Sequence, residues 1–252
     1  MKIIGIDTCS EAVSVGLVDD NKSEHIREKA HRQQLTILVP IIKNLLDRNG
    51  MKVSDVDLFA VTTGPGSFTG IRLGIATVKS LCQVNNIRAA SVNTLDAIAA
   101  GDFLNSTGGI DPEKWTIVIP SMDAKKNEIF SCVYARKGSE IKRLSGYLKQ
   151  SVDEYFNYLN TIENLEIPKS VQANLNPMPL ITGSVFNKYG NLFEERFSGR
   201  YITTTDEHWY PNGLIVAALG KKIADKGDST GYIGIVPNYM RESDAVPPAS
   251  MV

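Results

Sequence analysis

The chain has 252 residues, of which 42% are hydrophobic and 22% are charged, and its formal net charge at pH 7 is −1. These are ordinary values for a globular protein, and they exclude the disordered and fibrous classes. The balance of 27 basic against 28 acidic residues argues against a protein that holds a nucleic-acid backbone by itself, because such proteins usually carry a basic excess.

The three cysteines, Cys9, Cys82 and Cys132, are far apart and form no CxxC pair. An odd number without ligand spacing predicts buried thiols in a reducing compartment, with neither a disulfide framework nor a zinc site. The apolar run after Met1 is too short for a signal peptide, and no segment approaches the roughly 20 apolar residues of a membrane span. The sequence therefore predicts a cytoplasmic protein without membrane contact.

The first elements in chain order are predicted strands. Lys2–Asp7 is mostly apolar, and Ala12–Val18 alternates between apolar and other residues, as a half-buried hairpin requires. A third short strand is expected near Glu24–Glu28. From His31 to Asn49 the period changes to that of a helix.

This first predicted helix carries a wide apolar surface. On a helical projection its apolar residues fill an arc of roughly 200°, about twice the width that a helix on one sheet needs. Two interpretations are open: the helix is buried between two layers of its own domain, or one flank packs on the sheet and the other meets a partner. The arc consists of Leu35, Ile37, Leu38, Val39, Ile41, Ile42, Leu45 and Leu46.

A glycine-rich loop follows the next predicted strand. The strand covers Asp57–Thr62, the loop Gly64–Gly70, and a second helix is expected over Thr69–Gln83. One side of this helix carries a stripe of small or apolar residues, and such a stripe allows another helix to come close. The stripe is formed by Leu73, Ala76 and Ser80.

A strand at Arg88–Val92 and a helix at Thr94–Ala100 continue the alternation, which predicts an α/β domain with parallel strand pairing. The polar stretch Asn105–Pro112 is the expected boundary between two halves. The elements expected beyond it are a hairpin of Trp115–Pro120 and Glu128–Tyr134, a helix at Val152–Leu159, a strand at Pro179–Thr182, a helix at Gly213–Lys226 and an extended segment at Pro237–Glu242.

Two features of the first half suggest an anion site. A glycine loop before a helix presents free amide groups to phosphate, although it equally suits a tight packing turn, and the Lys-Ser/Thr end of a P-loop is absent. A carboxylate after the first strand suits metal and phosphate binding as in an actin-like ATPase, or simply caps a turn. The candidate residues are Asp7, Thr8, Gly64, Gly66 and Ser67.

Other catalytic patterns are missing. The histidines His25, His31 and His208 show no paired spacing and no HExxH arrangement, so no metal site is expected. A GxSxG nucleophile elbow is also absent. The sequence offers no assignable catalytic residue.

Several of these segments together resemble the TsaB (YeaZ) family. The resemblance is dense over residues 1–100 and sparse afterwards. Its most specific part is the long glycine-loop motif Gly64–Gly74, which we call the signature loop. The resemblance rests on Ile4–Thr8, His31 before Leu35 and Pro40, Gly64–Gly74, Ser91–Leu95, Asp123-Ala124 followed by Glu128-Ile129, and Pro237–Arg241.

The resemblance implies an ASKHA (actin-like ATPase) fold with two subdomains, each a mixed sheet with flanking helices. The N-terminal subdomain, with the dimerisation helices, would cover residues 1–108 and the C-terminal one residues 109–252. The implied partner-binding surface contains His31, Leu35, Val39, Leu73, Ala76 and Ser80.

The resemblance also implies a function. The chain would be a non-catalytic scaffold or activator of TsaD in forming threonylcarbamoyladenosine in tRNAs that read ANN codons. Expected partners are TsaD as a heterodimer, TsaE in a ternary complex, and a second copy in isolation, with tRNA reached only through the complex. No tightly bound cofactor is expected, and ATP or ADP would bind only in the assembled complex, so the anion site above would be vestigial.

Comparison with the catalytic relative supports the helper role. The two histidine ligands of the TsaD metal motif correspond to Thr94 and Ile98, and neither replaces an imidazole. The turn Asp123–Glu128 lacks the family's glycine, and only Ile181–Ser184 remains of an adenosine loop. The alternatives are an ATP-binding kinase or hydrolase that uses Asp7, and a glycoprotease-like metallopeptidase.

Overall fold

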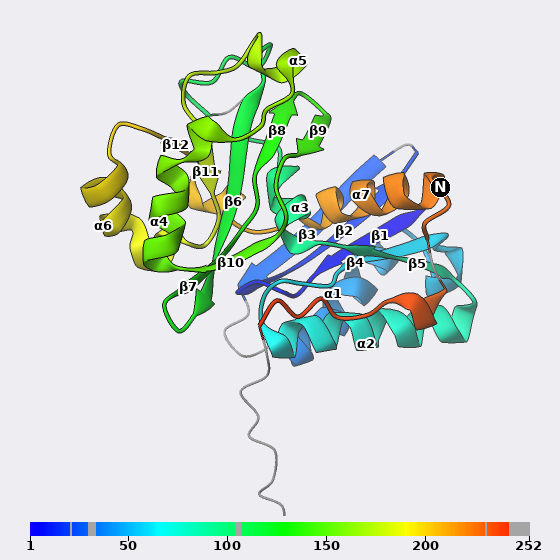
Figure 1. The fold of residues 1–252 in the computed structure, drawn as a ribbon. Helices are drawn as coiled ribbons and strands as arrows, with labels where there is room; N and C mark the ends of the chain where they lie inside the picture. Colours follow the sequence, from blue (N-terminus) through cyan, green and yellow to red (C-terminus); the bar gives the residue numbers. More distant parts are fainter. Residues whose placement is uncertain (21, 30–33, 104–106, 230, 242–252) are drawn as a thin grey trace, which may run out of the picture.

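The computed structural model describes residues 1–20, 22–29, 34–103, 107–229 and 231–241. Two β-sheets stand next to each other, and helices pack against both, so the predicted α/β class is confirmed (Figure 1). Within the described residues, no helix combines the length and apolar character needed to cross a membrane.

The first sheet has five strands in the order β3-β2-β1-β4-β5. The first three form an antiparallel meander, and β4 and β5 continue the sheet parallel to β1. All three predicted strands of the opening and both later ones are present. Their bounds are β1 Ile3–Asp7, β2 Ala12–Asp19, β3 Lys22–Lys29, β4 Leu58–Thr62 and β5 Arg88–Val92.

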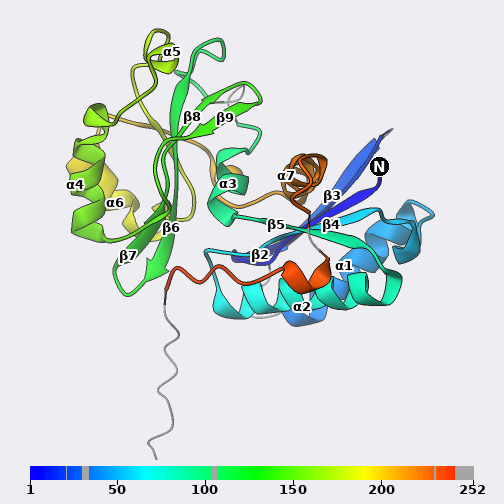
Figure 2. The same cartoon turned by 45° about the vertical axis from the view of Figure 1, so that its right-hand side comes forward.

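Helices cover both faces of this sheet (Figure 2). Helices α1 (Gln34–Arg48) and α2 (Phe68–Asn85) lie on one face, and α7 (Gly213–Asp225) lies on the other. Helix α7 approaches the strands at van der Waals distance through glycine. A Cβ atom on Gly5 would lie 2.2 Å from the carbonyl oxygen of Gly213, so a larger residue would force the helix away.

The two sheets share a buried core at one end. Helix α3 (Thr94–Ala99) follows β5 and packs on strand β6 of the second sheet. The Tyr134 hydroxyl donates to Oδ1 of Asp96 at 2.5 Å, and Nη1 of Arg136 donates to the carbonyl of Ala99 at 2.9 Å. Because these contacts are buried or partly buried, this junction joins the two halves firmly.

The second sheet is built on one long strand, β6. Its first half pairs with β8 and its second half with β7, while β11 lies along its other side. The strands are β6 Thr116–Lys125, β7 Glu128–Ser131, β8 Tyr134–Lys137, β9 Glu140–Arg143, β10 Leu148–Ser151, β11 Leu180–Thr182 and β12 Ile202–Thr203.

The prediction of one continuous strand over Glu128–Tyr134 is wrong, because the structure divides it between β7 and β8. The chain leaves the ladder at Cys132 and Val133 and re-enters it as β8. The freed amide of Val133 donates to the Ser145 hydroxyl at 2.9 Å, and its carbonyl accepts from the amide of Leu144 at 2.8 Å. Distant residues therefore satisfy the backbone groups that a continuous strand would have paired.

Helices of the second half enclose an aromatic core. Helix α4 (Val152–Asn160) matches its prediction, and the capping box of Ser151 and Glu154 explains its start. The predictions missed α5 (Lys169–Gln172) and α6 (Phe186–Phe197). Four short 3₁₀ helices complete the described elements: η1 Val53–Asp55, η2 Ile162–Asn164, η3 Asp206–His208 and η4 Tyr232–Gly234.

The chain returns to the first sheet at its end. Helix α7 packs on β1, β2, β4 and β5, and residues 232–241 run along α2. We call the first sheet with α1, α2 and α7 the first lobe, and the second sheet with α3 to α6 the second lobe. The division at residues 108 and 109 stays a prediction, and the lobes defined by packing place residues 213–241 with the first lobe.

Candidate functional site

A cleft of about 1070 Å³ separates the two lobes. The turn after β1 and the start of α2 line one side, and the β6–β7 turn and α6 line the other. Its two cationic groups from the second lobe share one carboxylate: Nζ of Lys125 lies 2.9 Å and Nζ of Lys188 lies 3.9 Å from Asp123. The cleft therefore has little net positive charge to offer a polyphosphate.

Asp7 does not line this cleft. It ends β1 fully buried, where its Oδ1 accepts hydrogen bonds from the Thr62 hydroxyl at 2.6 Å and the Cys9 amide at 3.2 Å. Its Oδ2 accepts from the Ser10 hydroxyl at 2.6 Å. Burial raises the pKa of this carboxyl, because the charged form loses its hydration, and the three hydrogen bonds oppose the rise only in part. The geometry fits a turn-capping carboxylate.

The glycine-rich loop packs backbone against backbone. A Cβ atom on Gly66 would lie 2.4 Å from the carbonyl oxygen of Cys9, and one on Gly64 would lie 2.4 Å from that of Asn238. The amide of Ser67 donates to the same Cys9 carbonyl at 2.9 Å, and the Thr8 hydroxyl donates to the carbonyl of Gly70 at 2.7 Å. Packing alone thus requires these glycines. Ser67 begins α2 as its N-cap and lies at the cleft.

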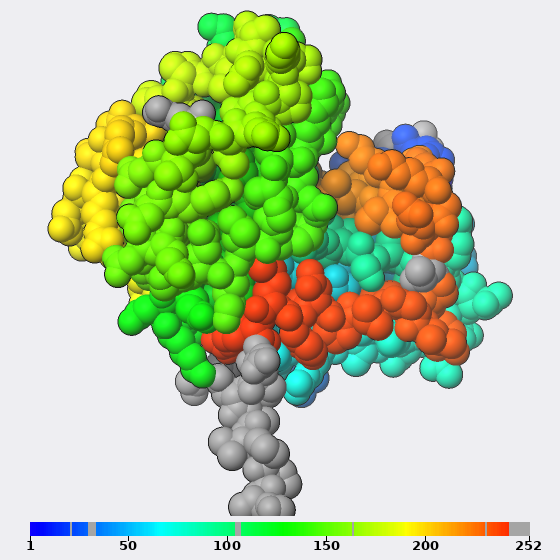
Figure 3. Space-filling view, in the orientation of Figure 1, coloured from blue at the N-terminus to red at the C-terminus, as the bar shows by residue number. Residues whose placement is uncertain are grey.

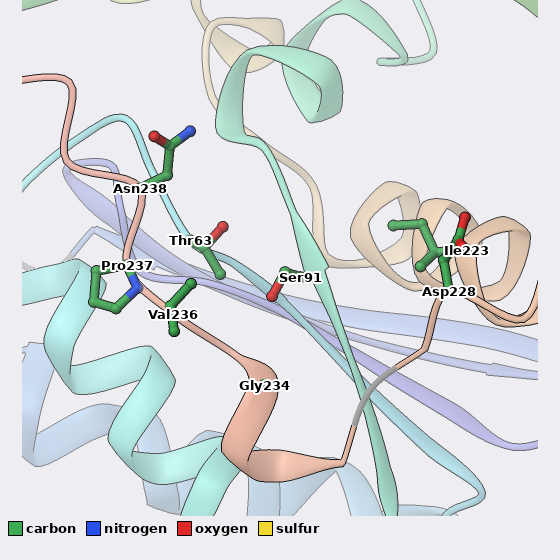
Figure 4. A pocket seen from close by; sticks show the side chains of 8 residues that line it. All are labelled: Thr63, Ser91, Ile223, Asp228, Gly234, Val236, Pro237 and Asn238. Atoms are coloured by element: carbon green, nitrogen blue, oxygen red, sulfur yellow. The ribbon is translucent and has the colours of Figure 1, made fainter.

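A second hollow, of about 430 Å³, lies between α7 and residues 234–238 (Figure 4). The hydroxyls of Thr63 and Ser91 face it, and Ile223 and Val236 give it apolar walls. Asp228 is the one titratable side chain among its lining residues. This set lacks the acid–base pair or ligand cluster that catalysis requires.

Thr94 and Ile98, which the resemblance aligns with metal ligands of the catalytic relative, are unsuited to metal. Thr94 starts α3 and is fully buried, and Ile98 is 1% exposed in the core that joins the lobes. A hydroxyl and an aliphatic side chain do not fit a transition-metal site. Among the described residues, no group of three His, Cys, Asp or Glu side chains could hold a metal ion.

The most distinctive surface lies on α1 and α2. Leu35 is 73% exposed and Val39 is 56% exposed, while the other side of α1 is buried against the sheet. On α2, Ala76 and Ser80 are exposed and Leu73 is half-buried. One flank of α1 therefore faces away from its own domain, so the helix is not buried between two layers, and contact of this flank with a partner stays a prediction. His31 lies outside the described residues.

The sequence prediction of this surface omitted one residue, Val84. Val84 is 83% exposed and follows Ser80 by four positions, so it extends the α2 stripe by one turn. The predicted helix stopped at Gln83, although the helical spacing to Val84 was readable in the sequence. We call Leu35, Val39, Leu73, Ala76, Ser80 and Val84 the helix stripe.

Replacing Asp7 by asparagine is expected to leave the protein folded, because an amide keeps the oxygen acceptor and the shape. Replacing it by alanine should lower the free energy of unfolding by about 3 kcal/mol, since buried donors would lose their acceptor. Urea unfolding of both variants measures the difference. An Asp7→Asn protein that fails to fold would contradict the turn-capping role.

The free energy of unfolding of the Asp7→Asn variant should depend on pH differently from that of the unmodified chain, and the sign of the difference follows from the pKa of Asp7. The folded-state pKa of Asp7 is raised, so its contribution to stability is present below the unfolded pKa of about 3.9 and is lost as pH rises through the folded value. The variant lacks this titration and should gain stability relative to the unmodified chain over that pH range. A stability difference that stays constant across this range would contradict the assignment.

Known proteins resemble this chain over most of its length. The family model described as "TsaD: tRNA N6-adenosine threonylcarbamoyltransferase" matches residues 25–226. The tRNA threonylcarbamoyladenosine biosynthesis protein TsaB of Haemophilus influenzae is 24% identical over 96% of this chain and 94% of its own length. The TsaB protein of Bacillus subtilis is 24% identical over 97% and 96%, and that of Escherichia coli is 30% identical over 54% and 56%.

The structural comparison agrees. YeaZ from Pseudomonas aeruginosa superposes with a TM-score of 0.73 at 22% sequence identity, covering 95% of this chain and 99% of that chain. At this identity the likeness bears on the fold alone, and with the two mixed sheets it confirms the predicted ASKHA fold. The chain belongs to the TsaD (tRNA N6-adenosine threonylcarbamoyltransferase) family, and within it to the TsaB (YeaZ) proteins.

Proposed function

We propose that this chain is a non-catalytic subunit that scaffolds and activates a TsaD-family transferase. Its family takes part in forming threonylcarbamoyladenosine in tRNA, which we expect in tRNAs that read ANN codons. The observation that carries the proposal is the helix stripe. Large apolar side chains that stay exposed on adjacent helices mark a surface for another protein.

The interior of the chain supports a helper role. The carboxylate of Asp7 is buried and accepts hydrogen bonds from neighbouring residues of the chain, and the glycines of the signature loop pack against backbone atoms. Thr94 and Ile98 lack the ligand atoms that a catalytic metal requires. The chemistry of transfer therefore falls to the partner, and this chain contributes a surface.

The composition of the α2 stripe fits a helix–helix contact. Ala76 and Ser80 are small enough for the axis of a partner helix to approach closely, and Leu73 and Val84 supply apolar area at either end. In the assembly this surface binds the TsaD-family protein, and TsaE joins the pair. In isolation it binds a second copy of the chain. ATP or ADP and tRNA bind only to the assembled complex.

Reconstitution tests this function. Threonylcarbamoylation of tRNA is measured with the TsaD-family protein of the same organism, TsaE and threonylcarbamoyl-adenylate, with and without this chain. We expect at least about 10-fold more product when the chain is present, and none from the chain without TsaD. Equal product without the chain would overturn the activator role. ATP turnover by the isolated chain, lost in Asp7→Ala, would instead favour a kinase or hydrolase.

A further inference from the structure

The segment Ile235–Arg241, which we call the strap, touches both lobes. It follows η4 and runs over the surface from α2 to the second lobe (Figure 3). Ile235 fixes its start, because this side chain is fully buried in the core beneath the first sheet. Residues 238–241 form part of the lining of the interlobe cleft.

The strap holds the first turn of α2. The amide of Asn238 donates to the carbonyl of Thr63 at 2.7 Å, directly before the signature loop. The ring of Tyr239 lies 4.9 Å from that of Phe68, and its hydroxyl accepts a hydrogen bond from Nε of Arg72 at 2.9 Å. Phe68 and Arg72 are one helical turn apart, and Arg72 directly precedes Leu73 of the helix stripe.

The end of the strap holds the second lobe. Nη1 of Arg241 donates to the carbonyl of Ala124 in β6 at 2.7 Å, and Met240 packs against the core that includes Ala124. The guanidinium carbon of Arg241 also lies 5.4 Å from the ring centroid of Phe68. Arg241 therefore contacts the start of α2 and the β6–β7 hairpin at once.

A second contact between the lobes lies at the cleft and does not involve the strap. The Tyr210 hydroxyl accepts a hydrogen bond from Nδ2 of Asn187 in α6 at 2.7 Å and lies 3.3 Å from the carboxylate of Glu11 in the first lobe. This contact bridges the lobes far along the chain from α2. Its loss should widen the cleft and leave the strap's own contacts in place, so it tests whether cleft width reaches α2 through the strap.

We infer that the strap couples the width of the interlobe cleft to the first turn of α2, and thereby regulates the helix stripe. The lobes are joined firmly at α3, so opening of the cleft moves Ala124 away from α2. Arg241 contacts Phe68, and Tyr239 contacts both Phe68 and Arg72, so that movement displaces the first turn of α2. The regulatory part of this inference rests on the proposed function, whereas the coupling is a property of the isolated chain.

Hydrogen exchange of the isolated chain tests the coupling. Arg241→Ala should raise amide exchange by about 5-fold or more in both the loop and first turn at 63–70 and the hairpin turn at 122–127. Arg200→Ala is the matched control, because Arg200 also packs over a phenylalanine ring, that of Phe197, but away from the strap. Tyr210→Phe should widen the cleft with the strap intact, so it should also raise exchange at residues 63–70, and adding it to Arg241→Ala should cause no further rise there.

Partner binding tests the regulation. Coupling through the strap should change the affinity for the TsaD-family partner by about 5-fold in Arg241→Ala, and partner binding should in turn alter exchange at residues 122–127 of the unmodified chain. If exchange at 63–70 in Arg241→Ala equals that of Arg200→Ala, the coupling is overturned. If Arg241→Ala binds the partner normally while Ala76→Arg does not, the regulation fails and the proposed function stands. Normal binding by Ala76→Arg contradicts the proposed function and leaves the exchange result intact.

Discussion

Replacement of Ala76 by arginine is expected to abolish binding of the TsaD-family partner while the chain stays folded. Ala76 is exposed at the middle of the α2 part of the helix stripe, so a longer side chain meets nothing in its own domain. At a close helix–helix contact the same side chain would separate the helices and bury an unpaired charge. We expect affinity to fall by about 100-fold or more, a loss of at least ~2.7 kcal/mol.

Calorimetric titration of the purified partner with each variant measures this loss, and thermal unfolding shows whether the variant is folded. The matched control is Asn44→Arg, an exposed helical position on α1 about 140° around the helix from Val39. It adds the same charge outside the helix stripe and should bind normally. If Ala76→Arg binds as tightly as Asn44→Arg, the helix stripe is not the partner surface.

Replacement of Gly70 by alanine is expected to destabilise the fold strongly, although alanine is the better helix former. A Cβ atom on Gly70 would lie 1.9 Å from the carbonyl oxygen of Thr8 and 2.9 Å from its carbonyl carbon. Both atoms are backbone at the end of β1, so the helix or the sheet must shift. We expect a loss of about 3 kcal/mol, which lowers the melting temperature by roughly 10 °C.

Thermal unfolding without any ligand checks this expectation and distinguishes the two roles of the loop. If the glycines served only to admit phosphate, Gly70→Ala would fold normally and lose only an anion-dependent rise in melting temperature. The control is Gly190→Ala in α6, where an added Cβ meets nothing within 4 Å. That change should leave stability unchanged or raise it by up to about 1 kcal/mol. Equal melting temperatures for the two variants would contradict the packing role.

Local pattern was sufficient for most elements of the first lobe. The alternation in Ala12–Val18 and the helical period after His31 depend on neighbouring residues, so they predicted β2 and α1 closely. The wide arc was also readable, because helical geometry fixes which side chains share a flank. What the arc meant depended on the position of the sheet, and only the structure showed that Leu35 and Val39 face away from it.

The second lobe was harder to predict because its strands depend on distant partners. The run Glu128–Tyr134 is uniformly suited to a strand, and its break at Cys132 is satisfied by Ser145 and Leu144. Such contacts between distant residues leave no local signal. Helix α6 differs, because its aromatic residues recur at helical spacing and its stripe was readable in the sequence; they are Phe186, Tyr189, Phe193 and Phe197.

The sequence by itself determined the identity of the signature loop, the order of the first-lobe elements and the absence of imidazole at Thr94 and Ile98. Only the tertiary structure decided what the loop glycines do, where α7 packs and that the strap reaches Ala124. The physical reason is sequence separation. Periodicity is set by residues a few positions apart, whereas the pairs Gly5–Gly213 and Ala124–Arg241 meet across more than 100 residues and exist only once both lobes are folded.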